Sequence, residues 1–172
     1  MITDIGILTK YNLWANQRIV DWLLSNEENK LDESCNSSFP TIRLTINHIL
    51  EAQILYLSIL KQIPFSKNYD STAIKTIKIL IEQSQEFSDY SSQLEMKELN
   101  DFRSVGFKFL SGTFTQAQLI QHCMNHSTYH RGQIITMGHQ LELTKAPSTD
   151  LLFYFNKVEK TNHIAKTSKS NS

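Results

Sequence analysis

Apolar residues recur at three- and four-residue steps along four long stretches of the chain, which is the period of an amphipathic helix. The first stretch covers residues 4–25, with the stripe Ile5, Leu8, Ala15, Ile19 and Trp22. The second begins near Thr41, with Pro40 predicted in its first turn, and stops before Pro64. Its stripe is Ile42, Ile49, Ala52, Tyr56 and Ile59, and His48 lies beside it.

The other two helical stretches lie on either side of a short segment of different character. The pattern predicts a third helix over residues 72–99 and a fourth from Thr115 to about Leu143. The fourth opens with a capping-box pattern, in which Gln118 follows Thr115 by three residues. Between them, "DFRSVGFKFLSGTFT" combines Phe, Val and Thr with Gly106 and Gly112, which predicts a small β-hairpin.

Four amphipathic helices joined by connections of moderate length predict an all-α helical bundle. A final short helix or strand is expected after Pro147, in "STDLLFYF". The remaining residues, "KTNHIAKTSKSNS", are polar and rich in Ser and Lys. We therefore predict one domain over residues 1–159 and a flexible polar tail over residues 160–172.

Charge and composition exclude several classes of function. The chain of 172 residues has 17 basic and 17 acidic residues, so it has no basic excess to attract nucleic acid or an anionic membrane. No stretch approaches the roughly 18 consecutive apolar residues of a membrane span, and the first residues show no signal-peptide pattern. Two cysteines, Cys35 and Cys123, are too few for a disulfide framework. These features favour a cytoplasmic protein.

The candidate chemistry lies in histidines at four-residue spacing within the fourth helix: His122, His126 and His130. Residues four apart on a helix differ by about 40° in direction and about 6 Å in height. Two such imidazoles can bind one ion, but the outer two lie about 12 Å apart along the axis. A single ion must therefore use either His122 with His126 or His126 with His130.

A third ligand must come from another helix. His48, beside the apolar stripe of the second helix, is the natural candidate, whereas His139 and His163 lie near or beyond the end of the fourth helix. Three histidines leave at least one position open for water or substrate, which is typical of a catalytic metal site. The "HExxH" glutamate of zinc proteases is absent, because Ser127, Thr128 and Tyr129 lie between the two histidines.

The segments "NHSTYHRGQII" and "TINHIL", with "YNLWANQRIVDWL" near the start and "STDLLFYF" near the end, resemble the DinB family over almost the whole chain. The resemblance implies an antiparallel four-helix bundle, usually a dimer, that holds one divalent ion on three histidines. Carried over by position, these ligands are His48, His126 and His130. The family's damage-inducible name describes regulation, and the neutral chain offers no DNA-binding surface.

The resemblance also suggests chemistry. Members of the wider superfamily act as metal-dependent transferases and isomerases that use low-molecular-weight thiols, so the analogy favours a thiol S-transferase with a small-molecule substrate. A metal-dependent hydrolase and a non-catalytic metal-binding stress protein are the alternatives. Imidazole ligands suit several metals; we expect Zn or Ni, with Fe, Mn or Cu as alternatives. A homodimer is expected from the resemblance and from aromatic residues on the first and fourth helices.

Several residues near the motifs differ from the family or invite a second role. Gln53 and Tyr56 stand where many members have Asp and Trp; Gln53 can hydrogen-bond but brings no negative charge to a cation such as Arg131. Tyr56 is predicted to pack in the core.

Gly132 and Gly138 each cost roughly 1 kcal/mol inside a helix, which predicts close helix approach at both. Cys123 is predicted to be a small buried residue, and His122 to form a hydrogen bond behind the site or in the core.

Overall fold

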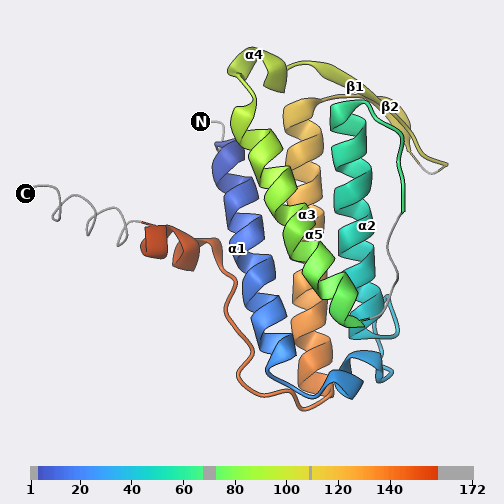
Figure 1. Cartoon of the computed structure of the whole chain (residues 1–172), viewed down its shortest axis with the longest axis vertical. Coiled ribbons are helices and arrows are strands. Elements are labelled where there is room, and N and C mark those ends of the chain that lie inside the picture. The colour runs from blue at the N-terminus through green and yellow to red at the C-terminus, as the bar shows by residue number, and fades with distance from the viewer. Residues whose placement is uncertain (1–3, 68–72, 109, 159–172) are drawn as a thin grey trace, which may run out of the picture.

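Four long helices lie side by side in the part of the chain that the structure describes, residues 4–67, 73–108 and 110–158 (Figure 1). This structure is a computed structural model. The long helices are α1 (Ile5–Leu24), α2 (Ile42–Lys61), α3 (Ala73–Gln93) and α5 (Gln116–Gln140). Shorter elements complete the fold: the 3-10 helix η1 (Glu28–Asp32), α4 (Met96–Leu99), β1 (Phe102–Gly106), β2 (Ser111–Thr115) and a helix over residues 151–158.

The predicted four-helix bundle with a small hairpin before the last long helix is confirmed. Its helices contact one another in the cyclic order α1, α3, α2 and α5. The pairs α1–α3 and α2–α5 run antiparallel, as expected for all neighbours, but α2–α3 and α1–α5 run parallel (Figure 1). Between Lys61 and Ala73 the chain therefore returns to the end of the bundle at which α2 begins, so α3 runs in the same direction as α2 (Figure 1).

Capping groups set the ends of the helices and explain where the sequence-based limits were wrong. The predicted start of α2 near Thr41 is confirmed, because the Thr41 hydroxyl caps the helix by accepting the Leu44 amide at 3.2 Å, but Pro40 lies before the helix and not in its first turn. The third helix ends at Gln93 and not at Leu99, because Glu95 is extended (ψ 161°) and forms a new capping box with Glu98.

The start of α5 agrees with the prediction from the sequence, whereas its end does not. The capping box of Thr115 and Gln118 is confirmed. The helix stops at Gln140, three residues before the predicted limit, where Glu142 takes a positive φ of 61° and the Leu143 amide bonds to the Gly138 carbonyl. The segment after Pro147 is helical over residues 151–158, and the predicted tail over residues 160–172 lies outside the described residues.

A polar layer divides the buried core into two apolar clusters. One cluster, around Ile19, Ile46 and Met137, lies at the η1 end, and the other, around Leu57, Phe87 and Ile120, lies at the hairpin end. Between them, every long helix contributes fully buried polar side chains: Asn12, Asn16, Gln53, Ser84, Ser127 and Arg131. The sequence patterns did not predict this layer.

Gly138 permits the close approach of α5 to α1, as predicted, whereas Gly132 does not. A Cβ atom on Gly138 would lie 2.2 Å from Trp22 Cη2, but one on Gly132 would meet nothing within 4 Å. Trp22 cannot easily move aside, because it is buried and its Nε1 donates to the Thr144 carbonyl at 2.8 Å.

Gly138→Ala should therefore lower the free energy of unfolding by about 1–3 kcal/mol through overpacking. Gly132→Ala is the matched control and should raise it by up to about 1 kcal/mol, because alanine is the better helix former. Urea unfolding of both variants measures the difference. Equal effects of the two substitutions would contradict the packing at Trp22.

None of the helices in the described part of the chain is both long enough and apolar enough to cross a membrane.

Candidate metal centre

Three histidines from two helices meet on the side of the bundle where α2 packs against α5. His48 comes from α2, and His126 and His130 come from successive turns of α5. One ring nitrogen of each lies within 4.8 Å of the others, and the Nε2 atoms of His48 and His126 are 2.9 Å apart. Of the two histidine pairs that the spacing left open, the structure brings His126 and His130 together with His48.

Gln133 fixes the orientation of the His130 ring. His130 Nδ1 lies 2.7 Å from Gln133 Oε1, and Gln133 Nε2 donates to Ser38 Oγ at 3.0 Å. Because the amide nitrogen faces Ser38, its oxygen accepts the Nδ1 proton, which leaves the Nε2 lone pair of His130 directed to the cluster. This arrangement was not predicted from the sequence, although Gln133 lies only three residues after His130 on the same helix.

Aromatic rings surround the cluster. Phe39, in the segment before α2, packs 4.6 Å from the His48 ring and 5.8 Å from the His130 ring, measured between centroids. Tyr129 lies edge-on to His130 at 5.0 Å and is 62% exposed. His130 is buried, while His48 and His126 are partly exposed, so the cluster lies just below the surface.

Burial keeps the three imidazoles neutral, as metal ligands must be. It lowers the pKa of His126 to about 4, with help from the nearby His130, His48 and His122. The pKa of His48 is lowered by burial and by His130, although Glu51 opposes this. The pKa of His130 is also lowered by burial, against the opposing hydrogen bond to Gln133.

The lowered pKa of His126 predicts how acid affects the metal-free protein. Between about pH 4 and 6.5 the unfolded chain binds a proton that the folded chain does not, so stability should rise with pH across this window. His126→Ala should make that rise shallower. Urea unfolding at a series of pH values, with a chelator present, measures the slope, and an unchanged slope in the variant would contradict the assignment.

His122 and Cys123 lie outside the cluster. His122 is exposed; its ring stacks on that of His126 at 6.0 Å and lies tilted against that of Tyr56 at 5.2 Å, measured between centroids. Among the described residues no protein group hydrogen-bonds to the His122 ring, which contacts the rings of His126 and Tyr56. Cys123 is fully buried in the apolar cluster at the hairpin end, and burial strongly raises the pKa of its thiol. Tyr56 packs in the same cluster, as predicted.

Arg131 follows the last histidine but points the other way, into the polar layer. Its Nη1 donates to Asn12 Oδ1 at 2.5 Å and to Asn16 Oδ1 at 2.9 Å, and its Nη2 donates to Thr128 Oγ1 at 2.7 Å. The guanidinium also lies 5.5 Å from the Tyr11 ring. Within the described residues its hydrogen bonds go to neutral oxygens, and burial lowers its pKa.

Gln53 belongs to this polar layer and not to the histidine cluster. The Ser84 hydroxyl links it to Asn16: Asn16 donates to Ser84 Oγ at 2.9 Å, and Ser84 donates to Gln53 Oε1 at 3.0 Å. Gln53 is therefore connected to Arg131 only through two intervening side chains.

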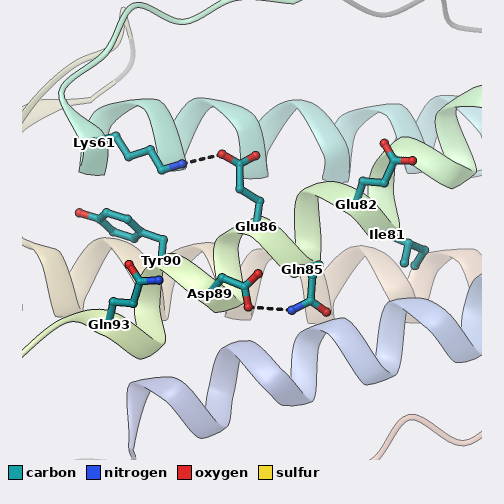
Figure 2. A pocket seen from close by; sticks show the side chains of 8 residues that line it. All are labelled: Lys61, Ile81, Glu82, Gln85, Glu86, Asp89, Tyr90 and Gln93. Atoms are coloured by element: carbon teal, nitrogen blue, oxygen red, sulfur yellow. Dashed lines mark hydrogen bonds and ion pairs between the residues drawn. The ribbon is translucent and has the colours of Figure 1, made fainter.

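Apart from the histidine cluster, a pocket of about 630 Å³ lies on the outer face of α3 beside α2 (Figure 2). Among its wall residues, Lys61 lies 2.5 Å from Glu86, and Gln85 donates to Asp89 at 2.8 Å. No histidine or cysteine lines it, so the metal-binding chemistry of the described residues lies at the histidine cluster.

The donor set fits a divalent transition metal. Imidazole nitrogens bound to one tetrahedral ion lie roughly 3.4 Å apart, as bonds of about 2.1 Å require. The spacings in the cluster, from 2.9 Å to less than 4.8 Å, bracket that value, so small side-chain rotations would bring the three nitrogens onto one ion.

Comparisons with known proteins agree on one family. The model of the DinB family matches residues 1–162. Protein DinB of Bacillus subtilis (strain 168) is 27% identical over 176 residues, which cover 89% of this chain and 95% of that protein.

Two solved structures show the same fold. A DinB-like protein from Bacillus cereus ATCC 10987 has a TM-score of 0.65 at 18% identity, covering 81% of this chain and 91% of its own. YfiT from Bacillus subtilis, described as a probable metal-dependent hydrolase with an unusual four-helix bundle topology, has a TM-score of 0.61 at 12% identity. That match covers 80% of this chain and 87% of YfiT.

Proposed function

The chain belongs to the DinB family, and from this premise we propose that it is a metal-dependent thiol S-transferase whose ion is held by His48, His126 and His130. The convergence of three neutral imidazoles near the surface is the observation that carries this proposal. An ion bound there supplies Lewis-acid chemistry, lowering the pKa of a thiol or water molecule in its open position.

The residues around the cluster favour a thiol as the nucleophile. Three neutral histidines leave the charge of a divalent ion uncompensated, so an anionic fourth ligand is favoured. In the described part of the chain no carboxylate hydrogen-bonds to the three histidines, and the Glu51 carboxylate is already paired with Lys67. A thiol, with an ordinary pKa near 8.5, loses its proton more readily than water and depends less on a general base.

A metal-dependent hydrolase is the second candidate. It is favoured by YfiT, which shares the fold and is described as a probable metal-dependent hydrolase. The same histidines would serve it, with water as the nucleophile.

A panel of low-molecular-weight thiols, assayed with monochlorobimane as the electrophile, tests the proposal. Metal-dependent, thiol-dependent conjugation is expected, and it should disappear when the ion is removed with a chelator. Thiol-independent turnover of activated esters would favour the hydrolase instead. If neither assay shows turnover while the protein retains its metal, a non-catalytic metal-binding protein is favoured.

The metal itself is proposed to be Zn or Ni, with Fe, Mn or Cu as alternatives, because neutral imidazole binds all of them. Elemental analysis of protein purified without an affinity tag identifies the ion. The expected stoichiometry is a single ion per chain.

We also propose that the protein is a homodimer. Trp14 and Tyr11 of α1 pack against Tyr154 of the C-terminal helix, and beside this aromatic group Leu152 and Phe153 are 78% and 60% exposed. Exposed apolar side chains of this size favour burial against a second copy. Solution scattering that shows only monomers at high concentration would contradict the dimer.

A further inference from the structure

Two rows of side chains face each other where α2 packs against α5, and the candidate metal centre occupies only one part of these rows. On α2, His48, Ala52 and Tyr56 follow one another at four-residue steps, and His122, His126 and His130 do the same on α5. Because the two helices are antiparallel, His48 meets His126 and His130, while Tyr56 meets His122. The two rows therefore extend from the metal centre toward the hairpin.

At the hairpin end of these two rows lies a pocket of about 80 Å³. The pocket is lined largely by apolar and aromatic side chains: Tyr56, Val105, Leu110, Phe114, Leu119 and His122. Gln118, also in its wall, is committed to the capping box at the start of α5. His122 is thus the wall residue with ring nitrogens available to a ligand, and it stands between the pocket and His126.

The hairpin builds this pocket by packing over the ends of the two helices. Strand β1 contacts α2, and β2 contacts α5. Val105, in β1, is buried against the helices, whereas Leu110, in the turn, remains 42% exposed. The hairpin therefore adds an apolar wall about one helical turn beyond the candidate metal ligands.

We propose that this pocket binds an apolar end of the substrate, a branched alkyl group of three or four carbon atoms, while the polar reacting group of the same molecule lies at the histidine cluster. The inference rests on the proposed function, since it places the reacting group at the metal. The size of this alkyl group follows from the volume of the pocket, about 80 Å³. A closed cavity of about 150 Å³ accommodates benzene, so a pocket of roughly half that volume suits a smaller group. His122 lies beside the part of the substrate that connects the two ends.

Two metal-binding probes test the pocket directly. Acetohydroxamate carries only a metal-binding head, whereas 6-methylheptanohydroxamate adds a chain that spans about one helical turn and ends in an isopropyl group. Calorimetry on the zinc-loaded protein should show the longer probe binding roughly 50-fold more tightly, because each buried methylene contributes about a factor of four. Equal affinities would overturn the proposal.

Two substitutions reduce the pocket without touching the metal ligands. Leu110→Trp and Val105→Phe should remove most of the advantage of the longer probe and leave the affinity for acetohydroxamate unchanged. Leu24→Trp, at the exposed end of α1, is the control and should change neither affinity. Circular dichroism and melting temperature show whether Val105→Phe remains folded, and the partly exposed Leu110 keeps the test decisive if it does not.

A metal-free experiment separates this proposal from the function on which it rests. If the protein binds neither zinc nor acetohydroxamate, the proposed function fails. The pocket is then tested with 3-methylbutan-1-ol alone, by saturation-transfer NMR on the metal-free protein. A signal that Leu110→Trp abolishes supports the pocket, and a signal that is absent, or unchanged in that variant, overturns it.

Discussion

Replacing His126 with alanine should abolish metal binding. His126 contacts both of the other two histidines, with its Nε2 2.9 Å from that of His48 and its ring centroid 4.4 Å from that of His130. Without it, the two remaining imidazoles come from different helices and no longer form a three-ligand set. Since losing a group that merely orients a ligand costs about 10–100-fold in metal affinity, losing the ligand itself should cost more than 100-fold.

A graded set of variants makes the expectation specific. His48→Ala and His130→Ala should lose the ion almost as completely as His126→Ala. Gln133→Ala should weaken binding by about 10–100-fold, because it removes the group that orients His130. His122→Ala is the matched control, since it removes an imidazole from the same face of α5 and should keep the ion in place.

Metal content after dialysis, and affinity from competition with a chromophoric chelator, measure these effects. If His122→Ala loses the ion while His130→Ala retains it, the ligand assignment is wrong by one helical turn. Circular dichroism of the metal-free variants distinguishes loss of a ligand from loss of the fold.

The spacing of the histidines alone could not choose between these two assignments. Both pairs on α5 have the same four-residue separation, so they are geometrically equivalent within the helix. The choice depends on the level at which His48 of α2 faces α5, which is a property of the packed bundle. The family resemblance selected His126 and His130, and these are the two that the structure brings next to His48.

The sequence patterns also could not predict the directions in which the helices run. Apolar stripes such as that of Ile5, Ala15 and Ile19 correctly predicted the buried face of α1. An apolar stripe indicates which face of a helix is buried but not which way a neighbouring helix runs. The parallel pairs α2–α3 and α1–α5 could therefore not be predicted. Ends set by local capping, such as Thr115, were predictable, whereas the extended Glu95 was not.

The polar layer was not predicted because its residues are of types that usually lie on the surface. Asn12 and Asn16 of α1 are four residues apart and lie between apolar positions on the buried face, which is the one signal that could have revealed them. Arg131 gave no such signal, since arginine is almost never fully buried without a charged partner. Its burial follows from the neutral oxygens that three other side chains direct toward it.

Arg131→Met should therefore destabilise the protein strongly without affecting the metal centre. Methionine fills part of the space but donates no hydrogen bond, so the Asn12 and Asn16 oxygens lose the guanidinium. Each buried polar group left unsatisfied costs about 1–3 kcal/mol, and removing the buried charge offsets part of that cost. We expect a net loss of about 2–4 kcal/mol in the free energy of unfolding.

Two comparisons identify the cause of that loss. Arg18→Met removes an exposed arginine from α1 and should change stability by no more than about 1 kcal/mol. Asn12→Leu combined with Arg131→Met should recover part of the loss, because replacing both partners with apolar groups leaves fewer unsatisfied atoms. Urea unfolding measures all three proteins, and metal content should stay that of the wild type in Arg131→Met. If that variant were as stable as the wild type, the guanidinium would not be what satisfies the polar layer between the two apolar clusters.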